Sequence, residues 1–191
     1  MTTDATNFAA PDFSALAASR RSIRAYTDQQ IPQDILDAIL KDATTAPSWS
    51  NTRAFRVALA TGERADRLRK EYVRRFDQTL DIQHHKRFAT IKTALKRELP
   101  DGDFPVWKPY PKELRAPQVE VAKLVYGAYG VERRDYEGRD NANRRNVSAF
   151  NAPVMGFVFV HENMLPWSAM DAGLMLQTLF LSAKAHGVDS C

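Results

Sequence analysis

Apolar residues recur along the chain at two spacings, and each spacing predicts one type of element. Residues 31–46 place isoleucine, leucine and alanine at helical intervals, and Pro47 follows where such a helix would have to end. Residues 55–60 alternate large apolar side chains with other residues, which predicts a strand that stops at Gly62. The first third of the chain therefore predicts a helix followed by a strand.

The rest of the chain predicts more helices and one further strand. Helices are predicted at residues 68–80, 119–129 and 134–149. Residues 100–117 hold five of the ten prolines, which predicts a loop. Residues 153–160 are apolar on both faces, as in a central strand. Residues 168–186 are apolar nearly all round, which predicts a buried helix that ends at Gly187. This order predicts an α/β or α+β domain built on one small sheet.

Composition limits the class of protein. The 191 residues, 44% of them hydrophobic, predict one packed domain. The lone Cys191 excludes an intramolecular disulfide framework and fits a reducing compartment. No apolar run reaches the roughly 18 residues of a membrane-spanning helix, and the N-terminus lacks the basic start of a secretory signal. We therefore expect a cytoplasmic protein with no membrane partner.

The charge pattern leaves two interpretations open. The net charge is +4, and in residues 63–98 Lys and Arg outnumber Asp and Glu. A basic surface can bind nucleic acid, but acidic residues are interleaved throughout this stretch, which favours a solvated helix face. A basic nucleic-acid-binding protein, whose affinity would fall steeply with salt, stays the alternative from another functional class.

A second cationic cluster precedes the first predicted helix. Arg20, Ser22 and Arg24 would lie on one side of an extended segment and Arg21 on the other. Guanidinium groups bind phosphate in a two-pronged geometry. The residues alone fit either an anion site or ordinary surface arginines.

Five motifs, in order, resemble the FMN-dependent nitroreductase family. They are RRSIRAY at 20–26, APSWSN at 46–51, FNAPV at 150–154, DAGLMLQTL at 171–179 and AHGVDSC at 185–191. The resemblance implies an α+β fold, three-layer and α/β/α-like, with a small mixed, mostly antiparallel sheet flanked by helices. It also implies an NAD(P)H-dependent flavin oxidoreductase that reduces nitroaromatics, quinones or similar acceptors by hydride transfer through flavin N5.

The resemblance also implies the site. FMN is the cofactor, NADH or NADPH the co-substrate, and the protein a homodimer with FMN at its interface. No catalytic side chain and no metal are expected. The implied cofactor-binding residues are Arg20, Arg21, Ser22, Arg24, Pro47, Ser48, Trp49, Asn51 and Arg53. Family members with another flavin task, such as dehalogenation or flavin breakdown, stay a nearer alternative.

The chain departs from the family pattern at two places. Arg53 and Ala54 replace the usual Gln-Pro, so the local contact with flavin cannot be identical. The family also continues beyond Cys191 with segments that contact flavin and the partner subunit. The expected organisation is an N-terminal extension at 1–18 and a nitroreductase-like domain at 19–191. That domain has a variable helical excursion at about 63–149 and lacks the C-terminal part of the fold.

Overall fold

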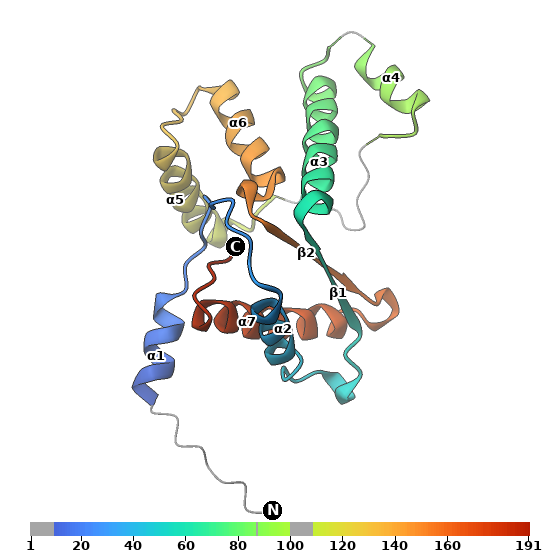
Figure 1. Ribbon diagram of the computed structural model, residues 1–191. Coiled ribbons are helices and arrows are strands. Elements are labelled where there is room, and N and C mark those ends of the chain that lie inside the picture. The colour runs from blue at the N-terminus through green and yellow to red at the C-terminus, as the bar shows by residue number, and fades with distance from the viewer. Residues whose placement is uncertain (1–9, 87, 100–108) are drawn as a thin grey trace, which may run out of the picture. The chain divides into compact units, whose positions relative to one another are not determined.

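The computed structural model describes residues 10–86, 88–99 and 109–191. The chain divides into two compact units: Met1–Ala65 with Ala152–Cys191 form the first unit, and Asp66–Asn151 the second. The α-helices and strands are labelled in Figure 1; in chain order, with the short 3-10 helices η1 to η3, the elements are α1 (Ala10–Ser19), α2 (Gln33–Ala43), η1 (Trp49–Asn51), β1 (Phe55–Thr61), α3 (Gly62–Gln83), α4 (Ala89–Leu95), α5 (Lys112–Ala128), α6 (Tyr136–Val147), η2 (Ala149–Asn151), β2 (Val154–Val160), η3 (Glu162–Met164) and α7 (Trp167–Ala185).

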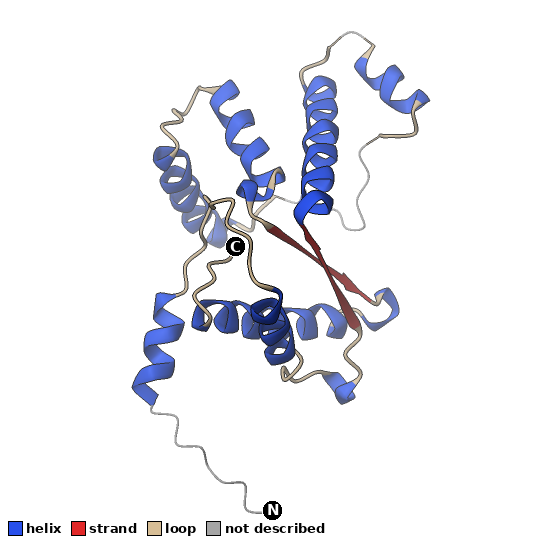
Figure 2. Cartoon of the chain, viewed as in Figure 1, coloured by secondary structure: helices blue, strands red, loops and turns tan. Residues whose placement is uncertain are grey.

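The first unit is built on the pair β1 and β2. Both strands are seen in Figure 2, and they run antiparallel with Phe55 opposite Val160 and Thr61 opposite Val154. Helix α7 packs against both strands, and α2 packs on α7. The predicted strands and the α+β class are therefore confirmed.

The core of the first unit forms where α2, α7 and the strands meet. Leu36, Ile39 and Ala43 are buried at the helical spacing that the sequence predicts for α2. Met175 of α7 is 1% exposed and packs beside Ala43 in this core. The interval between apolar residues thus sets which face of α2 meets α7.

Helix α7 is buried on one face only. Ser168, Asp171, Ala172 and Met175 are buried on the inner face, at helical spacing. On another face Met170 is 48% exposed and Leu174 41%. The prediction that this helix is buried nearly all round is therefore wrong for that face, because the described residues of this chain do not cover it.

Within the described residues of the first unit, one isolated parallel bridge joins the segment after α1 to the segment after α7. Ser22 pairs with Ser190, and the Ile23 N–H donates to the Ser190 carbonyl at 3.2 Å. The segment after α1 is therefore extended and lies next to the chain that leaves α7. With the antiparallel strand pair, this bridge gives the described part of the chain both kinds of strand pairing.

The second unit is helical. The helices predicted at 68–80, 119–129 and 134–149 are confirmed as α3, α5 and α6, although α5 ends at Ala128 and α6 spans only Tyr136–Val147. Helix α6 begins after Asp135, whose Oδ1 accepts the Gly138 N–H at 2.7 Å and so caps the helix. Among the helices of the described ranges, none has the length and apolar character needed to cross a membrane.

The loop prediction for residues 100–117 fails at its end. Residues 100–108 lie outside the described part, but α5 begins at Lys112 and contains Pro117. Proline inside a helix removes one backbone hydrogen bond, which is why the sequence favoured a loop there. Good helix formers surround Pro117, and α5 continues through it with Pro111 at its N-cap.

Candidate functional site

The arginine segment, residues 20–24, is held in place by backbone contacts on both sides. Its strand-like bridge to Ser190 fixes the extended conformation. Arg21 turns back to α1, where its Nη1 donates to the carbonyls of Ala18 and, at 2.9 Å, of Arg20. Arg21 therefore caps the C-terminal end of α1, where a cation is favourable.

Arg24 makes a weaker hydrogen bond to the backbone than Arg21 does. Its Nη1 lies 3.4 Å from the Ser22 carbonyl, at the limit of a hydrogen bond. Within the described ranges, no salt bridge involves Arg20, Arg21 or Arg24. Arg20 is half-buried, whereas Arg24 is exposed. The segment thus presents cations whose guanidinium groups are not neutralised by carboxylates of the described residues.

Tyr26 lies just beyond the arginine segment. Burial raises the pKa of its phenol to about 12, and the nearby Cys191 and Asp189 act in the same direction. The phenol therefore stays protonated at neutral pH and can donate a hydrogen bond.

The second group of predicted residues forms a tight loop between α2 and β1, residues 47–53. The Ser48 Oγ accepts the Arg53 N–H at 3.1 Å. The φ angles of Ser50, Asn51 and Arg53 are 50°, 55° and 46°, all in the left-handed region. For residues other than glycine this conformation costs free energy, so the loop needs support from its surroundings. Pro47 and Trp49 are exposed, and Trp49 retains 48% of its surface.

Support for this loop comes from the first turn of α7. The Trp49 N–H donates to both carboxylate oxygens of Asp171, at 3.0 and 3.1 Å. The Trp49 ring stacks on Trp167, with centroids 4.4 Å apart and an interplanar angle of 16°. Asp171 and Trp167 are absent from the site predicted by sequence. A signal was present, because Asp171 is the sole charged residue between Trp167 and Leu181 of an otherwise apolar stretch.

The two predicted groups lie at opposite ends of α7. The arginine segment pairs with Ser190, beyond the C-terminal end of the helix, whereas the loop is attached to Trp167 and Asp171 at its start. Nineteen residues separate these ends, which corresponds to about 28 Å of helix. The structure therefore holds both groups in the first unit without bringing them together within one chain.

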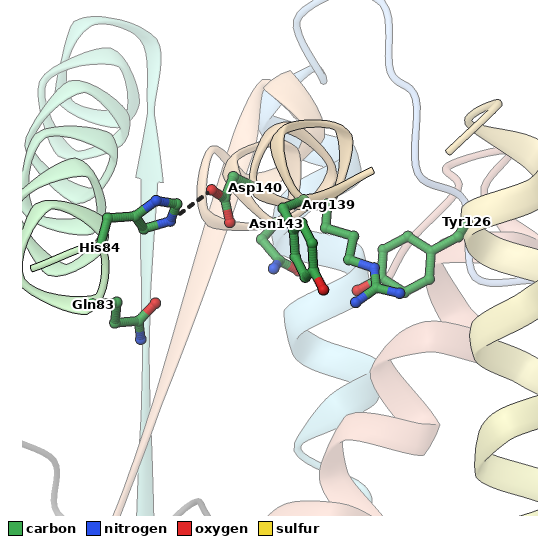
Figure 3. Close-up of a pocket in the computed structure, with 7 residues that line it drawn as sticks. Gln83, His84, Tyr126, Arg139, Asp140 and Asn143 are labelled. Atoms are coloured by element: carbon green, nitrogen blue, oxygen red, sulfur yellow. Dashed lines mark ion pairs between the residues drawn. The ribbon is translucent and has the colours of Figure 1, made fainter. Parts of the chain in front are cut away.

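A separate pocket of about 490 Å³ lies in the second unit, among the ends of α3, α5 and α6. Figure 3 shows His84 directed at Asp140, and their Nε2 and Oδ2 are 3.0 Å apart. The Arg139 guanidinium lies 5.9 and 5.6 Å from the ring centroids of Tyr126 and Tyr136. The charged groups that line this pocket, His84, Asp140 and Arg139, already have partners in the second unit.

Residue types that bind metal ions are spread out in the part of the chain that the structure describes. No group of three or more His, Cys, Asp or Glu side chains is placed there to hold an ion. Cys191 is exposed and free.

Comparison with known proteins gives one consistent result. The nitroreductase family matches residues 17–191. A 4-nitrobenzoate reductase of Pseudomonas putida is 31% identical over 181 residues, covering 94% of this chain and 71% of the relative. A 4-nitrobenzoate reductase of Nocardioides sp. (strain LMS-CY) is 32% identical over 180 residues, covering 94% and 67%. The crystal structure of the FMN-dependent nitroreductase NfnB from Mycobacterium smegmatis in complex with NADPH has a TM-score of 0.79 at 27% identity, covering 95% of this chain and 74% of that one.

Proposed function

Because the chain belongs to the nitroreductase family, we propose that it is an FMN-dependent oxidoreductase that uses NADH or NADPH to reduce nitroaromatic compounds. Quinones and similar small aromatic acceptors fall within the same proposal. FMN supplies the hydride chemistry when bound, and the side chains of this protein bind and orient it. The activities for which the relatives are named, two of them 4-nitrobenzoate reductases, support this substrate class.

The arginine segment suits the anionic parts of FMN. Arg20 and Arg24 bring guanidinium groups without carboxylate partners among the described residues, and Ser22 adds a hydroxyl beside them. We assign the FMN phosphate, the ribityl chain and the pyrimidine edge to these three residues. A fixed positive charge near the pyrimidine edge stabilises the negative charge that develops on the ring during reduction. Arg21 contributes less, because it is bound to the end of α1.

A site shared between two subunits follows from the position of the loop. The loop carries Ser48, Trp49 and Asn51 and is tied to the start of α7, whereas the arginine segment pairs with the chain beyond the other end of this helix, which is about 28 Å long. A mononucleotide held by the arginines does not reach the loop of the same chain. In a homodimer the second subunit can supply the loop, and the exposed Met170 and Leu174 of α7 offer apolar surface for such contact. The separation along α7 is the observation that carries this part of the proposal.

Ion pairs made by the arginines of α3 argue against the alternative function, nucleic-acid binding. Arg69 pairs with Asp66 at 2.6 Å, and Arg75 pairs with Glu71 at 2.8 Å. Arg74 lies between Glu71 and Glu98. These cations are largely neutralised by neighbouring carboxylates, which reduces the positive field available for phosphates.

The remaining parts of the proposal rest on the sequence. A cytoplasmic location is proposed from the lone Cys191. The predicted domain limits, including a helical excursion at about 63–149, also stay a proposal.

The function can be tested by spectroscopy on the purified protein. We expect a yellow protein, or a colourless one that gains a bound-flavin spectrum with FMN. NADPH or NADH should bleach that spectrum without oxygen, and 4-nitrobenzoate should restore it. The rates with the two nucleotides identify the preferred co-substrate. A protein that gives no change in the flavin spectrum at any FMN concentration would contradict the proposal.

A further inference from the structure

We infer that Asp171 is a positioning residue: it holds the loop 47–53 in the conformation that meets FMN. The inference rests on the proposed function, because it assumes that this loop contacts the flavin of the other subunit. Asp171 itself does not touch the cofactor in this assignment. It acts through the backbone of Trp49.

The carboxylate that contacts the loop is buried, and its partner is one backbone N–H. Asp171 is 1% exposed, and both of its carboxylate oxygens accept the Trp49 N–H, at 3.0 and 3.1 Å. A buried N–H that loses its acceptor is costly, and a charged acceptor makes a stronger bond than a neutral one. The loop is thus tied to α7 by its main chain, at the residue that begins η1.

A second contact from the same face of α7 fixes the side chain of Trp49. Trp167 lies four residues before Asp171, one helical turn away, and its ring stacks on the Trp49 ring. Backbone and ring of Trp49 are therefore both held by one turn of helix. Two such anchors determine the position and the direction of the loop.

The conformation of the loop explains why it needs these anchors. Ser50, Asn51 and Arg53 all have positive φ angles, which residues with a β-carbon rarely adopt. Such a conformation persists only where the surroundings hold it, and it is typical of ligand-binding segments. Without the bond from Trp49 to Asp171, the loop would relax toward ordinary backbone conformations. Ser48 and Asn51 would then no longer face the flavin together.

A control is available in another carboxylate contact of α7, made by Asp42 of α2. The Ser182 hydroxyl donates to Asp42 Oδ2 at 2.6 Å, so Asp42 also links α7 to a neighbouring element through a carboxylate. This link joins α7 to α2 and does not involve the loop. Asp42→Ala therefore reproduces the loss of a carboxylate tie to α7 without disturbing Trp49.

The first test monitors the conformation of the loop in protein without any cofactor. The stacked pair of Trp49 and Trp167 should give an exciton signal in the circular dichroism spectrum of the protein, and Trp167→Phe identifies that signal. We expect Asp171→Ala to abolish it and Asp42→Ala to keep it. Asp171→Asn, whose amide oxygen can accept the same N–H, should retain part of it. An unchanged signal in Asp171→Ala would overturn the inference.

The second test measures FMN binding in titrations of the full-length protein. We expect the FMN dissociation constant of Asp171→Ala to rise at least about tenfold, with Asp171→Asn in between and Asp42→Ala near the wild type. Wild-type protein that binds no FMN would overturn the proposed function together with this inference. Wild-type binding that Asp171→Ala leaves intact would overturn the inference alone.

Mixed dimers show through which subunit Asp171 acts. Co-expressed Arg24→Ala and Asp171→Ala chains, separated by different tags, should form a dimer with one tight FMN site, because one site then combines the intact arginine segment and the intact loop. If the loop that Asp171 holds met the FMN bound by the arginine segment of the same chain, each site would carry one defect and neither would bind tightly. The latter result would also contradict the inference.

Discussion

Replacing Arg24 should weaken FMN binding, whereas replacing Arg21 should mainly lower folding stability. The Arg24 guanidinium holds one marginal contact of 3.4 Å, so it can form a charge-assisted hydrogen bond to FMN. Such a bond contributes about 1.5–3 kcal/mol, and Arg24→Ala should therefore weaken FMN binding about ten- to hundredfold. Arg21 is already bound to the end of α1. Arg21→Ala should leave FMN affinity nearly unchanged and cost about 0.3–1 kcal/mol of folding stability.

Two measurements on each variant separate these outcomes. Titration with FMN, followed by flavin fluorescence, gives the dissociation constant, and urea denaturation of the protein without flavin gives the free energy of unfolding. Equal losses of FMN affinity in the two variants would refute the assignment of Arg24 to the side of the segment that faces FMN and of Arg21 to the opposite side. So would a large loss at Arg21 alone.

Two further predictions concern stability. Met175→Ala should lower the free energy of unfolding by about 2–5 kcal/mol in urea denaturation, because Met175 is 1% exposed in the core, whereas the same change at Leu95, which is 82% exposed, should cost far less. Hydrogen bonds from Arg74 lower the pKa of Glu71 to about 2 and also lower the pKa of Glu98. The contribution of these hydrogen bonds to folding stability is thus complete above the ordinary pKa of 4.5 and is lost as the pH falls toward 2. The melting temperature of Arg74→Ala should therefore fall less at acid pH than that of the wild type. An equal fall in both proteins would contradict this.

Local elements could be predicted from the sequence because their signals lie within a few residues. The alternation in residues 55–60 is the pleat of β1, and the apolar spacing in residues 31–46 is the buried face of α2. Pro117 misled the prediction because a proline disfavours a helix without forbidding it. Good helix formers on both sides of Pro117 favour the helix that is found.

The site could be predicted only in part. The arginine segment and the loop carry recognisable motifs, so the resemblance alone led to the proposal of their residues. The bond between Trp49 and Asp171 joins residues 122 positions apart, and periodicity says nothing about such distant pairs. The positive φ angles at Ser50, Asn51 and Arg53 were equally hidden, because none of these residues is a glycine.

The pairing of Thr61 with Val154 has a consequence for how such proteins diversify. These residues are the last of β1 and the first of β2, and they lie directly opposite each other in the sheet. Residues 62–153 therefore leave and re-enter the sheet at adjacent points, next to residues that are paired in it. The entropic cost of closing such an insertion grows slowly, by about 0.6 kcal/mol for each doubling of its length. Evolution can lengthen, shorten or replace this middle segment while the sheet, α7 and the tethered loop keep their arrangement.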